Sequence, residues 1–369
     1  MGCRRGYSGR VYYNVRRFLA WIASDKLLLS LATGYLIVSI LSPGFPRRSI
    51  HYADYRAIAT IASLMAGSLL LEASGLFQET ARKIVSGRRG RIAVSAFTLV
   101  VIASSLIVLN DAMIFIAVPL AVALARQSGT DKRLLVPLAI TAVNLGSSAS
   151  PVGNPQNIII WHYYNLTPAR FLSFTLPVYA APFAILLAYS YLSSPRTRAP
   201  RTSVPIFVDR RAASLGTASI VVTVVLAGFG RPYYVLLFSL GALAVYPRLA
   251  AGYDLRVPLD IWLAYTVLRG ASQLLSLKPY TGFEAYLAGF LASQAISNVP
   301  ATILLLGSSW KPLQLGVNLG GIPLPQSSIA NLVGLRIAGV SARDYVRTVL
   351  IVSITFFAYG LAVSLAISG

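Results

Sequence analysis

Asparagine is the residue type whose placement in this chain points most directly to chemistry. The sequence contains nine asparagines, and seven of them lie in or beside long apolar segments: Asn110, Asn144, Asn154, Asn157, Asn298, Asn318 and Asn331. A side-chain amide is costly to place in hydrocarbon, so amides in such segments are expected to have a function. Two interpretations are open. Each asparagine either binds a solute or ties off a broken helix or hairpin tip by bonding to backbone groups.

One asparagine-bearing segment, residues 144–157, must interrupt its helix. It holds Gly146, Gly153, Pro151 and Pro155 in an otherwise apolar stretch. Each proline removes a backbone donor and clashes with the preceding helical turn. A break at membrane depth is tolerated only where it is buried in protein or lines a cavity, because lipid does not satisfy the freed backbone groups. Half-helix amino ends favour anions, whereas unwound carbonyls and the oxygens of asparagine and serine can coordinate Na⁺.

The same segment recurs in the second half of the chain. Residues 144–157 align without gaps to residues 318–331, and Asn, Leu, Gly, Pro and Asn coincide at five of the fourteen positions. A second asparagine signal precedes each copy: Asn110-Asp111 in the first half and Ser297-Asn298 in the second. Weak internal similarity of this kind is typical of transporters built from two related halves.

These two pairs of segments define the candidate binding residues. They combine amides, hydroxyl groups, glycines that bare the backbone, and one carboxylate. The solute- or ion-binding candidates are Asn110, Asp111, Asn144, Gly146, Ser147, Ser148, Ser150, Asn154, Asn157, Ser297, Asn298, Asn318, Gly320, Gly321, Ser327, Ser328 and Asn331.

Composition predicts the kind of protein that positions these residues. Hydrophobic residues make up 56% of the chain and charged residues 12%, against roughly a quarter charged in an ordinary soluble domain. The apolar residues fall into thirteen blocks, most of them near the ~20 residues that cross a bilayer core. We therefore expect an all-α polytopic membrane protein embedded in the lipid bilayer.

The basic residues indicate a topology, because lysine and arginine are retained on the cytoplasmic side. If blocks 92–125 and 285–306 are re-entrant hairpins, nine crossings remain. The cytoplasmic segments then hold 24 of the 32 lysines and arginines, and the outer segments hold seven. This places the chain in the plasma membrane with its N-terminus in the cytoplasm and its C-terminus outside. The two interrupted helices then run in opposite directions, so the repeats are inverted, as a two-fold axis in the membrane plane requires.

The chain divides into four parts on this basis. A basic cytoplasmic arm spans 1–26, and a basic cytoplasmic linker with several prolines spans 195–213. The first transmembrane half, 27–194, contains the hairpin 92–125. The second, 214–369, contains the hairpin 284–309. The arm has no short apolar core followed by a small-residue cleavage site, so it is not read as a secretory signal.

The motifs resemble a known group of transporters. Asn110-Asp111, the segments 144–157 and 318–331, and Ser297-Asn-Val-Pro-Ala301 are similar to motifs of the arsenite permease, citrate transporter and NhaD-type antiporter members of the ion transporter superfamily. The resemblance covers about residues 50–367. It implies an inverted-repeat fold with two re-entrant helical hairpins and two interrupted transmembrane helices. It also implies a homodimer in which the part that carries the hairpins moves against a fixed scaffold.

The resemblance also implies where ions bind. Asn110 with the Gly146–Ser150 stretch would form one Na⁺ site at the first hairpin tip. Ser297 and Asn298 with Gly320 and Gly321 would form its mirror at the second tip. Three positions depart from the pattern of the dicarboxylate branch. Leu324 and Ser327 stand where that branch has threonine and glycine, which removes a potential sodium ligand from the second site. Asp111 stands where it has no acid, which shifts the resemblance toward the arsenite and proton-antiport branches.

Charged residues within the apolar blocks are further candidates. Asp111 could accept a coupling proton or complete a cation site, or it could cap the second hairpin arm. Arg269 could hold an oxyanion in a bidentate manner. We favour the alternative that Arg269 forms a buried charge pair with Glu72.

We expect a secondary active transporter that moves a small anion, an arsenite-like oxyanion or a carboxylate, coupled to Na⁺ or H⁺ by alternating access. A Na⁺/H⁺ antiporter of the NhaD type is the alternative within transport. An anion channel and a membrane-embedded enzyme are the alternatives of another class. No ATP-binding loop of the GxxxxGK[ST] type is present in the sequence, so a primary pump would need a separate subunit.

Other classes of protein are disfavoured. The net charge of +21 comes from residues between the apolar blocks and not from one folded face, which argues against nucleic acid as a partner. Cys3 is the single cysteine, and His51 and His162 are the two histidines. A disulfide framework and a Cys/His metal cluster are therefore excluded. No cofactor is expected beyond a coupling Na⁺ or H⁺.

Overall fold

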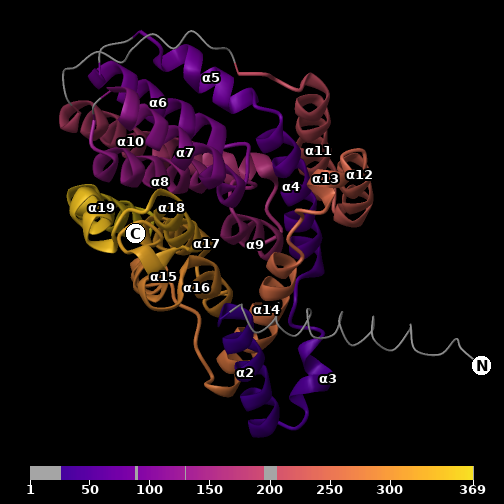
Figure 1. Cartoon of the computed structure of the whole chain (residues 1–369). Helices are drawn as coiled ribbons and strands as arrows, with labels where there is room; N and C mark the ends of the chain where they lie inside the picture. The colour runs from indigo at the N-terminus through magenta and orange to yellow at the C-terminus, as the bar shows by residue number, and fades with distance from the viewer. Residues whose placement is uncertain (1–25, 88–89, 129, 195–205, 369) are drawn as a thin grey trace, which may run out of the picture. The chain divides into compact units, whose positions relative to one another are not determined.

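The computed structural model describes residues 26–87, 90–128, 130–194 and 206–368. In these ranges the chain forms α-helices and one short 3₁₀ helix, with no β-strand (Figure 1). The predicted all-α class is confirmed. The expected basic arm, apart from Lys26, and most of the expected linker lie outside the described residues.

The chain splits into two compact units. The first comprises Met1–Ala53 and Asp254–Leu277. Its described helices are α2 (Lys26–Leu41), α3 (Phe45–Ser49) and α14 (Arg256–Leu274). Gly34 of α2 faces the Val267 side chain of α14, and Gly270 of α14 lies against the Phe45 ring. Glycine at these points allows the elements to approach closely, as is common where membrane helices pack.

The second unit comprises Asp54–Tyr253 and Lys278–Gly369 and contains all the candidate binding residues. Its first-half helices are α4 (Tyr55–Ala73), α5 (Leu76–Val85), α6 (Gly90–Ser105), α7 (Asn110–Ser128), α8 (Lys132–Ser148), α9 (Pro155–Tyr163) and α10 (Pro168–Ser193). Its second-half elements are α11 (Arg210–Gly228), α12 (Pro232–Ala244), α13 (Pro247–Ala250), α15 (Gly282–Ile296), α16 (Asn298–Leu304), α17 (Trp310–Gly320), η1 (Pro325–Ser327), α18 (Ile329–Ala338) and α19 (Ala342–Ala366).

Four described helices are long and apolar enough to cross a membrane: α4, α10, α11 and α19. Four shorter apolar helices, among them α6, α12 and α18, are also present. The chain therefore has the helices of a multi-pass membrane protein. The expected nine crossings and the orientation of the termini stay predictions.

Helix is lost at both positions that the sequence indicates. α8 ends at Ser148 and α9 begins at Pro155, so the glycine- and proline-bearing stretch between them is not regular helix. α17 ends at Gly320 and α18 begins at Ile329, with only the short η1 between them. We call these stretches, residues 149–154 and 321–328, the first and second breaks.

Each break has a helix–turn–helix pair beside it in the second unit. α6 and α7 are joined by residues 106–109, and α15 and α16 are joined at Ser297, which has a left-handed φ of 72°. These pairs correspond to the expected hairpins 92–125 and 284–309. Their re-entry into the membrane stays a prediction.

Candidate functional site

The first break is closed by the side chain of Asn157. Its amide Nδ2 donates to three backbone carbonyl oxygens, those of Ser147 at 3.2 Å, Ser148 at 2.9 Å and Ser150 at 2.8 Å. The backbone N–H of Asn157 donates to Oδ1 of Asn154, which caps α9. One buried amide thus satisfies carbonyl groups at the end of α8 and within the first break, where the helical donors are missing.

The second break is closed in the same way by the aligned residue, Asn331. Its Nδ2 donates to the carbonyl oxygens of Gly321 at 2.9 Å and Leu324 at 3.0 Å. Gly321 and Leu324 align with Ser147 and Ser150 of the first break. The two breaks therefore share two closing hydrogen bonds at aligned carbonyl groups, although only five of the fourteen aligned residues are identical.

Two further asparagines connect the breaks to each other. Nδ2 of Asn144 donates to Oδ1 of Asn331 at 2.7 Å, and Nδ2 of Asn318 donates to Oδ1 of Asn157 at 2.8 Å. Asn144 and Asn318 are aligned residues, so each half contributes the donor to one bond and the acceptor to the other. We call Asn144, Asn157, Asn318 and Asn331 the asparagine quartet; all four are buried.

Other polar residues extend this network between the two halves. Oδ1 of Asn318 accepts from Nδ2 of Asn154 at 2.9 Å, and Oδ1 of Asn144 lies 3.4 Å from the Ser328 hydroxyl, at the aligned position. Gln314 Nε2 donates to the carbonyl oxygen of Ser148 at 2.7 Å. Most of the predicted polar residues of the two segments are thus brought together, bonded mainly to one another.

The helix–turn–helix pairs lie against the breaks through aligned glycines. A Cβ on Gly146 would come within 2.4 Å of the Ile102 carbonyl oxygen in α6, and a Cβ on Gly320 within 2.8 Å of the Phe290 Cα in α15. At the first turn, the Asn110 N–H donates to the Gly153 carbonyl oxygen at 2.8 Å. At the second turn, Nδ2 of Asn298 lies next to Gly321. Both turn asparagines therefore adjoin a break.

Three buried acceptor atoms near the breaks have no hydrogen-bond partner among the described residues: Oδ1 of Asn110, Oε1 of Gln156 and Oε1 of Gln294. Asn110 was a candidate from the sequence, whereas Gln156 and Gln294 were not. Buried polar groups normally have partners. Unpartnered acceptors beside broken helices are therefore suited to a cation or to a solute that donates hydrogen bonds.

The orientations of the two glutamine amides are fixed by their neighbours. Gln294 Nε2 donates to the backbone oxygens of Phe290 at 2.9 Å and Gly320 at 2.5 Å. Gln156 Nε2 donates to Oδ1 of Asn318 at 3.2 Å. That oxygen is the acceptor end of Asn318, because its Nδ2 donates to the backbone oxygen of Gln314. In both glutamines the oxygen is therefore the free end.

The remaining candidates are placed as follows. Asp111 lies in the first turn of α7, directly after Asn110, so both interpretations of its carboxyl group stay open. Glu72 belongs to α4 and Arg269 to α14, which are in different units, and their pairing stays a prediction. Ser327 lies in η1 and bonds to the Leu324 carbonyl oxygen at 2.6 Å. The described residues contain no cluster of three or more His, Cys, Asp or Glu side chains able to hold a metal ion.

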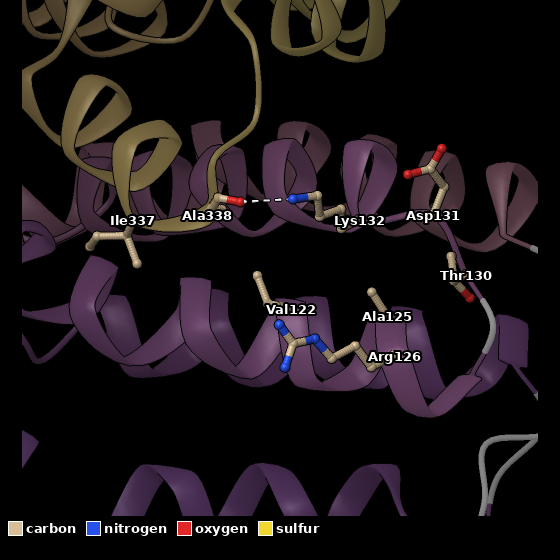
Figure 2. Close-up of a pocket in the computed structure, with 8 residues that line it drawn as sticks. All are labelled: Val122, Ala125, Arg126, Thr130, Asp131, Lys132, Ile337 and Ala338. Atoms are coloured by element: carbon tan, nitrogen blue, oxygen red, sulfur yellow. Dashed lines mark hydrogen bonds between the residues drawn. The ribbon is translucent and has the colours of Figure 1, made fainter.

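A separate pocket of about 470 Å³ lies where α7 and α18 end and α8 begins. Figure 2 shows Lys132 directed toward the backbone of Ala338, whose oxygen it contacts at 3.1 Å, while the Asp131 carboxylate points away from Arg126. The residues that line it are Val122, Ala125, Arg126, Thr130, Asp131, Lys132, Ile337 and Ala338. None of them is a predicted binding residue, so this pocket is distinct from the breaks.

Comparison with known proteins places the sequence among membrane transporters. The CitMHS family model, described as citrate transporter, matches residues 18–308. Inner membrane protein YbiR of Escherichia coli (strain K12) is 30% identical over 336 residues, which cover 87% of this chain and 90% of the relative. The uncharacterized transporter MJ0456 of Methanocaldococcus jannaschii is 27% identical over 326 residues, 86% of this chain and 90% of the relative. The arsenical pump membrane protein of Yersinia enterocolitica is 26% identical over 179 residues, 47% of this chain and 40% of the relative.

Proposed function

The chain belongs to the citrate transporter family, and from this premise we propose that it is a secondary active transporter whose solute and coupling ion bind where the two breaks adjoin the helix turns. It is a multi-pass membrane transporter and not an enzyme. The solute we propose is a small anion, an arsenite-like oxyanion or a carboxylate, moved by alternating access with Na⁺ or H⁺.

The unpartnered acceptor oxygens carry this proposal. Asn110, Gln156 and Gln294 each present a buried oxygen without a partner among the described residues. A desolvated acceptor of this kind is costly unless a ligand satisfies it. Na⁺ is bound by such amide and backbone oxygens where helices are unwound. These oxygens therefore support a cation site at the breaks.

The anion would bind after the cation. The predicted binding residues include no lysine or arginine, so the positive charge for an anion must come from elsewhere. The amino ends of α9 and α18 face the two breaks, and helix amino ends favour negative charge. A bound cation beside them adds the charge that makes anion binding favourable, which couples the two ligands.

The matched contacts of the two halves support an inverted repeat. The closing bonds, the quartet bonds and the glycine contacts all recur at aligned positions. We propose that α6–α7 and α15–α16 are re-entrant hairpins entering from opposite faces, with the N-terminus cytoplasmic and the C-terminus outside. A homodimer, with the hairpin-bearing part moving against a scaffold, is part of the same proposal.

Transport by purified protein in proteoliposomes tests the function. With an inward Na⁺ or H⁺ gradient, we expect uptake of arsenite, citrate, succinate, phosphate or sulfate against its own gradient. Asn110→Ala and Asn298→Ala should each reduce this uptake by more than about tenfold, the effect of losing one charge-assisted bond. Asn165→Ala is the control, because Asn165 is exposed and bonds to Arg56 instead. Absence of gradient-driven uptake for every solute would refute the proposal.

Na⁺/H⁺ antiport is a second candidate, favoured by the position of Asp111 beside Asn110 in the first turn of α7. A carboxyl group there could exchange a proton for Na⁺. Exchange of Na⁺ for H⁺ by the same proteoliposomes, with no anion added, would support antiport over anion transport.

A further inference from the structure

The asparagine quartet differs from the unpartnered oxygens because its amides already have protein partners. Asn157 donates to three backbone oxygens and accepts from Asn318. Asn331 donates to two backbone oxygens and accepts from Asn144. Asn157 and Asn331 are both 0% exposed. A solute would have to displace these bonds in order to use the quartet as ligands.

The orientation of each quartet amide follows from backbone groups that can only accept. Nδ2 of Asn144 donates to the Ile140 oxygen at 3.0 Å, and Nδ2 of Asn318 donates to the Gln314 oxygen at 2.8 Å. Asn157 and Asn331 are fixed in the same way by the carbonyl groups of their own breaks. Rotating any of these amides by 180° would set oxygen against oxygen. The bonds between the halves are therefore determined by the backbone.

The quartet makes each break depend on the other. Asn157 closes the first break, and its oxygen is held by Asn318 of α17. Asn331 closes the second break, and its oxygen is held by Asn144 of α8. Opening one break would leave buried amide groups of the other half without partners, which is energetically costly.

We propose that the asparagine quartet is a brace that joins the two breaks into one cooperative unit, which opens, closes and moves as a whole. The four asparagines are then positioning residues that shape the solute site without contacting the solute. Their role as a brace stands apart from the proposed function; only the statement that they position a solute site rests on it.

Hydrogen exchange of the full-length protein in detergent tests the brace without any substitution. Peptides covering residues 149–154 and 321–328 should open with the same free energy and the same dependence on urea, because a cooperative unit opens at once. Opening of one break at much lower urea than the other would overturn the proposal.

The variant Asn144→Ala extends the test across the halves. This substitution in α8 should accelerate exchange in residues 321–328, by about tenfold for one lost hydrogen bond, as well as near its own position. Ser105→Ala is the matched control, since Ser105 is also buried and, among the described residues, its hydroxyl bonds to the Val101 oxygen of its own helix. Faster exchange confined to the first break would overturn the brace.

A double variant provides a rescue if Asn144→Ala folds poorly. Asn144→Cys with Asn331→Cys, in a Cys3→Ser background, places two thiols where the 2.7 Å bond lies. One Hg²⁺ ion bridging them should restore slow exchange in both breaks, whereas Hg²⁺ should leave the single-cysteine variants unchanged. Bridging that protects only one break would contradict the proposal.

The shift in melting temperature caused by 100 mM Na⁺, relative to choline, separates positioning from binding. Asn144→Ala should melt at a lower temperature in choline, and Na⁺ should still raise its melting temperature. In Asn110→Ala, Na⁺ should no longer raise the melting temperature. Complete loss in Asn144→Ala with an intact shift in Asn110→Ala would make Asn144 a ligand. If wild-type protein shows no shift, the cation site of the proposed function fails, and the exchange measurements still decide the brace.

Discussion

Asn144 donates its side-chain amide to Asn331 at 2.7 Å, across 187 residues of sequence. The aligned residues Asn318 and Asn157 repeat this bond at 2.8 Å. Reciprocal bonding of this kind joins two aligned segments of the chain at equivalent positions. The amides that the sequence predicts as ligands therefore already bond to one another. The buried acceptor oxygens without partners among the described residues are the remaining candidates for ligand binding.

Gln156 is the first of these, and its replacement should weaken ligand binding. Its buried Oε1 has no partner among the described residues, and its Nε2 donates to Asn318 Oδ1 at 3.2 Å. We expect Gln156→Ala to raise the half-saturating Na⁺ concentration for uptake roughly tenfold or more, since a ligand oxygen contributes about 1.5–3 kcal/mol when it contacts a charge. Gln78→Ala is a control, because Gln78 also has a buried oxygen without a partner among the described residues, while its Nε2 bonds to the Glu72 backbone oxygen, far along the chain from either break. Unchanged Na⁺ dependence in Gln156→Ala would exclude it from the site.

The close contacts of Gly146 and Gly320 predict a strong effect of one added methyl group. A Cβ at Gly146 would lie 2.4 Å from a backbone oxygen, which has no rotamer to escape into. We expect Gly146→Ala and Gly320→Ala to destabilise the protein by about 3 kcal/mol or more, at the upper end of overpacking effects.

Gly241→Ala is the matched control for these two variants. Gly241 also lies in a helix, but nothing is within 4 Å of its added Cβ. This variant should therefore stabilise the protein by about 0.5–1 kcal/mol through helix propensity. Thermal unfolding in detergent measures all three. Equal effects at the three glycines would contradict the close packing of hairpin helix on interrupted helix.

The sequence predicts the breaks well because proline and glycine act locally. Two glycines and two prolines fall within residues 146–155, and the structure loses helix between Ser148 and Pro155. Prolines without such glycines beside them lie inside α7, α8 and α10 and leave those helices unbroken. The hydrogen-bond partner of each asparagine side chain depends instead on which helices pack together. Whether Asn144 meets a solute or Asn331 is decided by residues far along the chain. Local patterns carry no information on that choice.

The two glutamines show the other limit of sequence reasoning. Gln156 lies inside the aligned segment, yet its counterpart is Ala330, so the repeat gives it no emphasis. Gln294 precedes the Ser297-Asn298 signal by about one helical turn, on the side of α15 that reaches the Gly320 oxygen. A search of each motif for any amide one turn away would have found Gln294. That its Oε1 has no partner follows only from the structure, in which its Nε2 bonds to the Phe290 and Gly320 oxygens.

Glu79 at the start of α5 predicts a pH effect outside the membrane-spanning helices. It accepts from Arg82 Nε at 2.7 Å and Nη2 at 2.6 Å and from the Ile206 N–H at 3.0 Å. These hydrogen bonds, that of Arg82 foremost, lower the pKa of Glu79 to about 2. A lowered pKa stabilises the folded chain above the ordinary value of 4.5, and this stabilisation is lost as the pH falls from about 4.5 toward 2.

The melting temperature should therefore fall more steeply between pH 5 and pH 3 in wild-type protein than in Glu79→Gln. At pH 7, exchange of the Ile206 amide should be roughly tenfold faster in the variant, the effect of losing one hydrogen bond to a charged group. Glu284→Gln serves as the control, because Glu284 is an exposed acid in the first turn of α15. Parallel pH profiles for wild type and Glu79→Gln would show that Glu79 does not hold the chain at Ile206.

Asp111→Asn separates the two coupling ions. Asparagine keeps the size of the side chain and removes its ability to release a proton at the amino end of α7. If Asp111 carries the coupling proton, uptake driven by an inward H⁺ gradient should fall at least about tenfold, because a transfer group is lost, while uptake driven by Na⁺ through Asn110 persists. Glu284→Gln is again the control. Glu284 is a solvent-exposed acid in the first turn of α15, the first helix of the other helix–turn–helix pair. Full H⁺-driven uptake in Asp111→Asn would assign its carboxyl group to stabilising the first turn of α7, where an acidic side chain complements the helix dipole.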